Sequence, residues 1–405
     1  MIPAPLAGLL GSFEVMDLSP PGWPAHFAFV LPGAEALRRW PGYPDAARPE
    51  SGRAAAGRGR TAVACLSGGL GEAVELASSC RWGDETVLRG RAADFAPDEA
   101  ILPDEWLGLT RGQMAARKRW NTARFGMADW RPAPLAPTRA IDWIAGRDAH
   151  SGALRWAPAD LVLIGRSPSD PEAVGIADTR GCAAGATSDA ALLHALRELA
   201  ERDAVGRWWH AMQPAPTLPH RCAELDAEMG GFLRDRARHT RFLRLAPASE
   251  RAAASDPGGV VVAAASADPD GCRVALGFAA RGSAAEAARD AAIEMLQTEL
   301  GLQQREALGD PLARLWLSRV RAGRGPLAPT AVCRCPTRAE PDAAAEITLR
   351  LDRLAARGLP ATLFDLTRPE FGVPVLRAAV PGLASDRPRW RAFGGRPANP
   401  FPLLV

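Results

Sequence analysis

The sequence is almost without lysine: Lys118 is the only one among 49 basic residues in a chain of 405, and the others are arginine. A Walker-type phosphate loop requires the pattern G-x-x-x-x-G-K-[ST]. Lys118 lies in ARKRWN, and no such glycines precede it. A nucleotide bound by this chain would therefore have to be held without that loop.

Long apolar runs and paired metal-binding cysteines are missing too. No apolar run approaches the roughly 18 residues that a membrane span needs, and the start MIPAPLAGLLGSF lacks the basic region of a secretory signal. Of the seven cysteines only Cys333 and Cys335 are close together, whereas a zinc site needs a second pair or nearby histidines. We therefore expect a cytoplasmic protein with no membrane contact and no thiolate-bound metal.

The charge balance argues against a nucleic-acid partner. The formal net charge is only +3, and 47% of the residues are hydrophobic while 23% are charged. This composition is typical of a folded protein. A near-neutral chain of this size has no excess of positive charge for phosphate backbones.

The first 58 residues differ in composition from the remainder. They are rich in proline and glycine, and the stretch ends in PESGRAAAGRGR. Clusters of this kind are typical of connections between folded parts. We therefore expect residues 1–58 to form a short N-terminal segment with a mobile linker, and residues 59–405 to form the main domain.

From residue 61 the pattern alternates between helices and strands. Helical spacing predicts helices over 70–79, 188–212, 283–306 and 341–357, with Ser188 as the N-cap of the second. Short apolar runs predict strands over 160–165, 260–266, 274–280, 361–367 and 373–380. The turn DPDG separates the second and third of these strands. The alternation predicts a mixed α/β fold.

Three of these helices carry acidic or amide side chains one turn apart, beside apolar residues. The pairs are Glu72 and Glu75, Glu198 and Glu201, and Glu294 and Gln297. The spacing places both members on one helix face, and buried carboxylates require a cation because like charges raise each other's pKa. Magnesium is the natural counter-ion, since it is usually shared between carboxylates and substrate phosphates. Taken singly, each pair is more simply explained as a solvated helix face, so the surrounding residues decide.

Five blocks of sequence resemble the YcaO family, in the expected order. They are GLGEAVEL, IDWIAGRDAHSGALRWAPADLV (141–162), GCAAGATSDAALLHALRELAERDAVGRWW (181–209), GFAARGSAAEAARDAAIEMLQTE (277–299) and LFDLTRPEFGVPVLRAAVPGL (363–383). Together they extend over most of residues 62–385. The resemblance implies the family's α/β fold, which has no Walker lysine and holds ATP through magnesium-bound glutamates.

The resemblance also implies roles for individual residues. The magnesium site would comprise Glu72, Glu75, Glu198, Glu201 and Glu294. Contacts to ATP or its phosphates would come from Thr179, Arg180, Arg202 and Gln297, of which Thr179 and Arg180 occupy the place of the family's usual Ser and Asn/Thr.

Three positions depart from the family pattern. Leu76 stands where an arginine usually follows the first E-x-x-E, and Arg281 stands in place of the usual histidine. Asp290 replaces the usual basic residue four positions before Glu294. Because of these departures, the alternative remains that the chain is a non-catalytic scaffold that binds a peptide or a partner.

Two further segments resemble one subclass of the family. LGLTRGQMAARKRWN (107–121) resembles l-G-f-S-x-R-Q-y-x-x-R-x-x-x-N, a segment of members that make thiazoles and oxazoles in ribosomal peptides. The ending PANPFPLLV resembles the proline-rich tail that such cyclodehydratases place near the active site. That resemblance would make the C-terminal carboxylate of Val405 a catalytic group, and an ordinary extended end is the alternative.

The resemblance as a whole implies an ATP-dependent cyclodehydratase that forms thiazoline or oxazoline rings from Cys, Ser or Thr of a precursor peptide. The same activation with another nucleophile would give a thioamide or an amidine. Residues 1–58 are too short for the ubiquitin-activating-enzyme-like domain that often binds the leader peptide. We therefore expect a separate leader-binding partner protein besides the precursor peptide, and a second copy of the chain is a further candidate partner.

Overall fold

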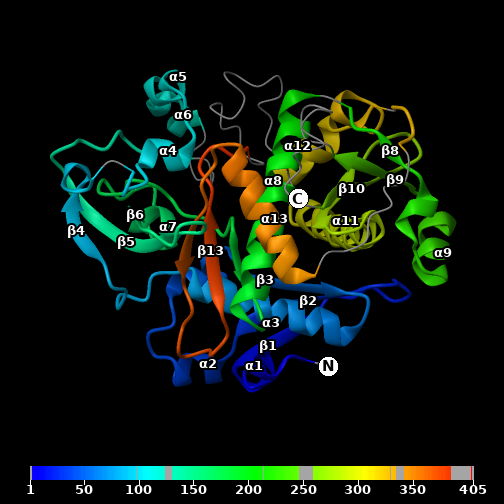
Figure 1. Ribbon diagram of the computed structural model, residues 1–405. Coiled ribbons are helices and arrows are strands. Elements are labelled where there is room, and N and C mark those ends of the chain that lie inside the picture. Colours follow the sequence, from blue (N-terminus) through cyan, green and yellow to red (C-terminus); the bar gives the residue numbers. More distant parts are fainter. Residues whose placement is uncertain are drawn as a thin grey trace.

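The computed structural model describes residues 2–96, 98–123, 130–212, 214–245, 259–328, 330–333, 342–384 and 403. Within these ranges the strands form three sheets in which every strand pair is antiparallel. The long helix α8 (Ser188–Ala211) lies at the centre of the molecule (Figure 1). The predicted mixed α/β fold is confirmed.

The first sheet consists of β1 (Phe13–Asp17), β2 (His26–Pro32) and β3 (Ala55–Gly59), in that order. Helix α3 (Ala62–Ser78) packs on β2 and β3, and glycines allow the close approach. A Cβ atom at Gly57 would lie 2.2 Å from the carbonyl oxygen of Cys65, and one at Gly59 would lie 2.7 Å from the amide nitrogen of the same residue.

Residues 55–59 are therefore a packed strand, whereas we expected them to belong to a mobile linker. The physical reason is that glycine serves close packing here as well as chain flexibility. Because side chains alternate along a strand, Gly57 and Gly59 face α3 and Arg58 between them points to the other side of β3. The division of the chain at residue 58 stays a prediction.

The second sheet has the order β11 (Ala275–Arg281), β10 (Val260–Ala267), β9 (His239–Leu245), β8 (Thr217–Leu218). Every residue of β10 is buried, and alternate residues belong to two different cores. Val262 and Ala264 pack with the alanines of α11 (Ala284–Ala307), while Val261 and Ala263 pack with the tryptophans of α8 and of α12 (Pro311–Arg319). The predicted strands 260–266 and 274–280 and the helix 283–306 are confirmed to within one residue at each end.

The third sheet has the order β4 (Leu88–Arg91), β5 (Ala140–Asp148), β12 (Thr362–Asp365), β13 (Val375–Ala379), β7 (Cys182–Ala184), and β6 (Leu154–Pro158) pairs with β5. Helix α8 packs on β13 and β7, and α13 (Ala343–Ala356) packs on α8. Helix α8 therefore contacts the second and third sheets at once, through β11 and β13. The predicted helices 70–79, 188–212 and 341–357 and the strands 361–367 and 373–380 are confirmed as α3, α8, α13, β12 and β13.

Two local predictions were wrong. Residues 160–165 do not form a strand, because the buried carboxylate of Asp160 accepts hydrogen bonds from Arg81 and Arg166 and holds a helical turn, α7 (Ala159–Val162). The N-cap of α8 is Thr187 and not Ser188, since the Thr187 hydroxyl accepts a hydrogen bond from a backbone N–H in the first turn at 3.2 Å.

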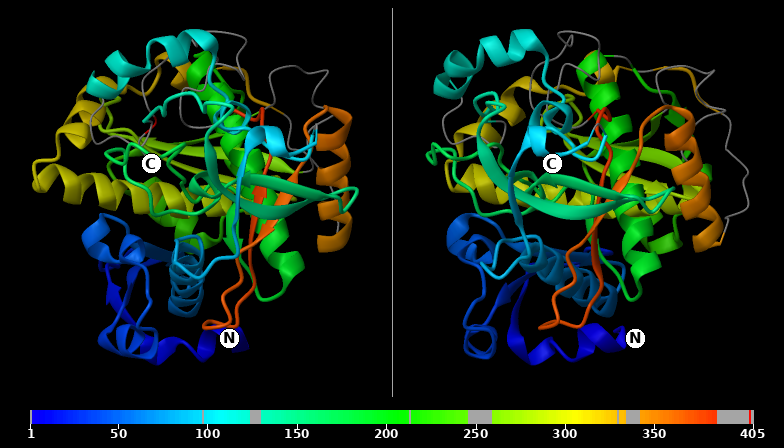
Figure 2. Two further views of the ribbon diagram at one scale, coloured as in Figure 1. Left: turned by 90° about the vertical axis from the view of Figure 1, so that its left-hand side faces the viewer. Right: turned by 60° about the vertical axis from the view of Figure 1, so that its left-hand side comes forward.

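The short helices are α1 (Ala4–Ala7), α2 (Ala34–Arg39), α4 (Pro103–Leu107), α5 (Arg111–Ala115), α6 (Arg117–Ala123) and α9 (Ala227–Asp235). Helices α5 and α6 lie at the end of the molecule opposite α3 (Figures 1 and 2). None of the helices in the described ranges has the length and apolar character to cross a bilayer.

Candidate functional site

Three helices bring the predicted acidic pairs together. Glu72 and Glu75 lie on α3, Glu198 and Glu201 on α8, and Glu294 on α11. We call these residues the acidic cluster. Their carboxylates are close enough for the charge of Glu294 to act on Glu72 and Glu201, and for the charge of Glu198 to act on Glu75. Glu72 keeps contact with solvent and the other four are half-buried, so the cluster lines an open site.

The acidic cluster is short of compensating positive charge. Removal from bulk water raises the pKa of the Glu72 carboxyl group and that of the Glu201 carboxyl group to about 7. The same cause raises the pKa of Glu75 well above its usual value and also raises the pKa of Glu198. Other glutamates of the acidic cluster raise the pKa of Glu72, Glu75 and Glu201 further, and the carboxylate of Asp178 raises that of Glu198 further. Carboxylates in this state are stabilised by binding a cation.

The donor set suits a hard, oxygen-binding cation such as magnesium. In the part of the chain that the structure describes, no three acidic, histidine or cysteine side chains already stand in a coordinating arrangement. Such an arrangement is not required for magnesium, which commonly takes one or two carboxylates and completes its shell with water and phosphate oxygens.

Arg58 of β3 reaches into the acidic cluster from the first sheet. Its Nη2 donates to Oε2 of Glu294 at 3.0 Å, and its Nη1 donates to Oε1 of Gln297 at 3.0 Å. The surrounding carboxylates, Glu294 first, raise the pKa of this guanidinium. Our sequence analysis missed Arg58 because we interpreted its surroundings as a linker. The alternation of glycine and arginine over 57–60 was the signal for a strand with one charged face.

The turn before β7 orients Glu198 through the backbone. The N–H of Gly181 donates to Oε2 of Glu198 at 3.0 Å. Gly181 has a φ of 69°, and a Cβ atom there would lie 2.2 Å from the carbonyl oxygen of Ala378. Only glycine combines this left-handed conformation with so close an approach, so the glycine that begins the block GCAAG fixes the position of a carboxylate.

The other predicted phosphate-binding residues surround the α8 side of the cluster. Nε of Arg202 lies 3.6 Å from Oε1 of Glu198. Arg180 donates from Nε to Oδ2 of Asp178 at 2.9 Å, and its charge lowers the pKa of Glu198. Thr179 belongs to the same turn, where its carbonyl oxygen accepts a backbone hydrogen bond at 2.9 Å. Their roles toward ATP stay predictions.

Arg377 of β13 is a second cation that the sequence analysis missed. Its side chain is 2% exposed and donates to the carbonyl oxygens of Val162, at 2.7 Å, and Asp178, at 2.6 Å. Its charge lowers the pKa of Glu75. The available signal was a single arginine inside the apolar strand VPVLRAAV, because a charge at such a position is retained only with partners.

The three departures from the family pattern have local explanations. Leu76 is 7% exposed and belongs to the core beneath α3, so this position faces away from the acidic cluster. Nη2 of Arg281 lies 2.6 Å from Oδ2 of Asp290. The other two departures therefore form an ion pair with each other and neutralise their charges.

The predicted catalytic carboxylate of Val405 lies outside the described residues. One residue of the proline-rich ending is described: Leu403 is 9% exposed and belongs to the core formed by Trp208, Trp209 and Trp316. Two of these tryptophans are on α8, beyond Glu201.

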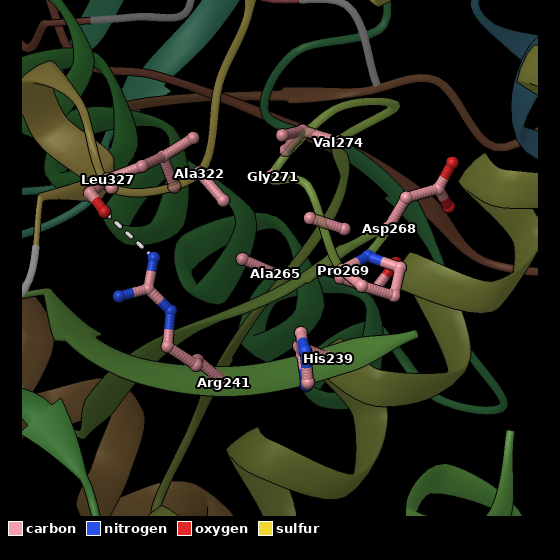
Figure 3. Close-up of a pocket in the computed structure, with 12 residues that line it drawn as sticks. His239, Arg241, Ala265, Asp268, Pro269, Gly271, Val274, Ala322 and Leu327 are labelled. Carbon is pink, nitrogen blue, oxygen red and sulfur yellow. Dashed lines mark hydrogen bonds between the residues drawn. The ribbon is translucent and has the colours of Figure 1, made fainter. Parts of the chain in front are cut away.

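A cavity of about 270 Å³ lies elsewhere, on the face of the second sheet opposite α11. Figure 3 shows Arg241 directed toward the carbonyl oxygen of Leu327, to which it donates at 2.8 Å. Much of the wall is apolar, for example Ala265, Val274 and Ala322, and none of the predicted site residues lines it. The acidic cluster offers carboxylate oxygens for magnesium, with Arg58 beside them, so we locate the candidate site there and not in this cavity.

A family model described as YcaO cyclodehydratase, ATP- and Mg²⁺-binding, matches residues 56–384, which is most of the chain. No curated protein sequence matches the chain. Among solved structures, a heterocyclase in complex with substrate and cofactor is similar, with 25% sequence identity and a TM-score of 0.80. The match covers 93% of this chain and 50% of that one.

Two further solved structures share the fold. The heterocyclase TruD has 24% identity and a TM-score of 0.67, over 84% of this chain and 50% of that chain. YcaO from Methanopyrus kandleri, bound with AMPPCP and Mg²⁺, has 18% identity and a TM-score of 0.62, over 98% of this chain and 94% of that chain. The chain thus spans about half the length of the two heterocyclase chains that it matches.

Proposed function

Because the chain belongs to the YcaO family, we propose that it is an ATP-dependent cyclodehydratase that forms thiazoline or oxazoline rings in a ribosomally made precursor peptide. The observation that carries the proposal is the acidic cluster, in which carboxylates from three helices meet Arg58 at an open site. Carboxylates whose pKa is raised in this way are suited to a metal–nucleotide complex, and the family model is described as ATP- and Mg²⁺-binding.

The proposed reaction begins when a Cys, Ser or Thr side chain of the peptide attacks the preceding carbonyl carbon. The resulting oxyanion takes the γ-phosphoryl group of ATP, and ADP leaves. Loss of phosphate and of the amide proton then closes the C=N bond of the azoline. Positioning and charge stabilisation are sufficient for these steps, so no covalent enzyme nucleophile is required.

The residues of the site would divide this work. Magnesium, when bound by Glu72, Glu75, Glu198, Glu201 and Glu294, would neutralise charge on the phosphate oxygens. Arg58, Arg180 and Arg202 would attract and orient the phosphates, and Thr179 and Gln297 would bind the nucleotide. The hydrogen bond from Gly181 holds the Glu198 carboxylate in place before the nucleotide arrives.

We further propose that the carboxylate of Val405 accepts the proton of the attacking side chain, as a general base. The resemblance of the proline-rich ending supports this role. The packing of Leu403 in the core that also contains Trp208 and Trp209 of α8 is compatible with it, because the same helix carries Glu198 and Glu201.

A separate partner protein would supply the leader-binding domain. The support is that β1, β2 and β3 form one sheet, and α3 packs on β2 and β3, so this part of the chain belongs to the body of the protein.

The decisive experiment is mass spectrometry of a precursor peptide encoded beside this gene, after incubation with the enzyme, the partner and ATP. Ring formation lowers the peptide mass by one water per modified residue. A thioamide would raise the mass, because sulfur replaces oxygen. An amidine formed with an amine of the peptide itself would also lower the mass by one water, so fragmentation must locate the change at a Cys, Ser or Thr. An unchanged peptide together with no ATP turnover would favour the scaffold instead.

A further inference from the structure

Helices α5 and α6 carry positive charges that no acidic residue balances within the part of the chain that the structure describes. Residues 108–123 contain four cations, Arg111, Arg117, Lys118 and Arg119, and no Asp or Glu. Arg117 is half-buried and the other three are exposed. Among the residues that the structure describes, none of the four has an ion-pair partner. We call these four residues the α5–α6 surface.

Arginines of the neighbouring sheet behave differently. Arg89 and Arg91 of β4 keep side-chain exposures of 61% and 55%, and both are nevertheless paired with carboxylates, at 3.0 Å to Asp142 and 2.8 Å to Asp94. Other exposed arginines of the described chain, for example Arg314 and Arg319 of α12, have no ion pair either, so a single unpaired arginine indicates nothing. On α5 and α6, four cations lie within nine residues with no acidic residue among them. Like charges close together repel each other, so a concentration of cations along a short stretch of chain is stabilised by a negatively charged partner.

The inner side of α5 and α6 is held firmly by polar contacts. Asn121 donates to the carbonyl oxygen of Arg131 at 2.8 Å and accepts from its backbone N–H at 3.0 Å. The Arg131 guanidinium is 3% exposed, stacks 3.7 Å from the ring centroid of Trp120 and donates to the carbonyl oxygen of Gln113 at 3.1 Å. A surface supported in this way presents its cations in a defined arrangement, which lowers the entropy cost of binding a partner.

The resemblance of this segment to the family does not depend on the exposed cations Arg111, Lys118 and Arg119. In LGLTRGQMAARKRWN the positions that match the family segment include Gln113 and Asn121, and these contribute to the inner contacts. Arg111, Lys118 and Arg119 occupy positions where the segment specifies no residue. Their charge is therefore a property of this chain.

We propose that the α5–α6 surface binds an acidic segment of the peptide substrate, at a distance from the acidic cluster; this rests on the proposed function. Helices of five and seven residues are about 8 and 10 Å long, which matches about six residues of extended peptide. No large apolar side chain of residues 108–123 is exposed. A protein interface or a bilayer surface normally uses such side chains, so a short acidic peptide is the better occupant.

The first test measures binding without turnover. The probe is a fluorescent peptide with about six glutamates, a length that spans about 20 Å when extended, and a glutamine version serves as the neutral probe. The variant R111E/K118E/R119E should bind the acidic probe at least about tenfold more weakly than the wild type. High salt should weaken binding of the probe by the wild type to a similar extent. The control R221E/R314E/R319E has the same change in net charge at other exposed arginines and should bind as the wild type does.

The second test uses the fact that Lys118 is the only lysine of the chain. A carbodiimide joins a carboxylate to an amine that it touches, so the acidic probe should become linked to Lys118 and be located there by mass spectrometry. K118R keeps the charge and removes the amine. This variant should bind the probe normally and lose the cross-link.

Each contrary result has a definite meaning. Equal binding by the two triple variants, or a cross-link of the wild type that maps elsewhere than Lys118, would overturn the proposal. Preference for a single-stranded oligonucleotide, for anionic vesicles or for the partner protein over the acidic peptide would overturn it in favour of that occupant. Because ATP is absent from both tests, failure of docking is distinguishable from failure of ring formation, which is measured by peptide mass.

Discussion

Replacement of Glu201 by glutamine should make the nucleotide-free protein more stable while it abolishes ATP hydrolysis. Loss of contact with bulk water and the neighbouring charge of Glu294 raise the pKa of Glu201 to about 7. Glutamine has the same shape and no charge, so Glu201→Gln removes the cost of ionising this group in the folded state. It also removes an oxygen charge that the proposed magnesium site needs.

The magnitude and its pH dependence follow from the pKa of Glu201. The rise from 4.5 to about 7 is about 2.5 units, and at about 1.4 kcal/mol per unit this corresponds to at most about 3 kcal/mol. Because the side chain is only half-buried, solvent screening reduces the expected gain to about 1–2 kcal/mol. The wild type loses this stability as the pH rises from about 4.5 to about 7, since the unfolded carboxyl ionises first. The Glu201→Gln variant should therefore have a larger free energy of unfolding than the wild type above about pH 7. Below about pH 4.5 the two proteins should be equally stable.

The assay is urea unfolding of both proteins at about pH 8 and about pH 4.5, alongside ATP turnover. Glu299→Gln is the control, since Glu299 of α11 lies outside the acidic cluster, is 4% exposed and is ion-paired with Arg236 and Arg238. Breaking that buried pair should lower the free energy of unfolding by about 3–5 kcal/mol. The molecules that remain folded should still hydrolyse ATP. If Glu201→Gln instead destabilised the protein at about pH 8 and hydrolysed ATP normally, the acidic cluster would be a structural network and not the nucleotide site.

Three further outcomes are expected. Arg58→Gln should reduce ATP turnover by about tenfold or more at unchanged helix content by circular dichroism, because Arg58 is the cation that contacts Glu294 and Gln297; normal turnover would remove Arg58 from the site. Deletion of residues 403–405 should depress peptide cyclisation much more than ATP binding if the Val405 carboxylate acts as the base; a parallel fall in melting temperature would instead assign the ending to packing, as the burial of Leu403 allows. The isolated chain should process a leader-bearing peptide slowly or not at all, and efficient leader-dependent processing without a partner protein would refute the need for one.

Local patterns in the sequence were sufficient to predict most of the helices and strands around the site. The i, i+3 spacing of Glu198 and Glu201 depends only on helix geometry, and the strand pair around DPDG depends only on alternation and turn chemistry. The errors occurred where one side chain outweighed the pattern. Asp160 is the clearest case, because its buried hydrogen bonds turned an apolar run into the helix α7.

The amino-acid sequence by itself determined the family, the mixed α/β class and the helix faces that carry the acidic pairs, because these depend on residues that are neighbours along the chain. Only the tertiary structure decided that those faces meet, and that Arg58 on β3 contacts Glu294 across 236 positions of sequence. The tertiary structure also decided that Arg281 and Asp290 neutralise each other and that the cations of the α5–α6 surface remain unpaired among the described residues. The reason is physical: a helix period fixes which side chains share a face, whereas the partner of a charged group depends on how distant elements pack.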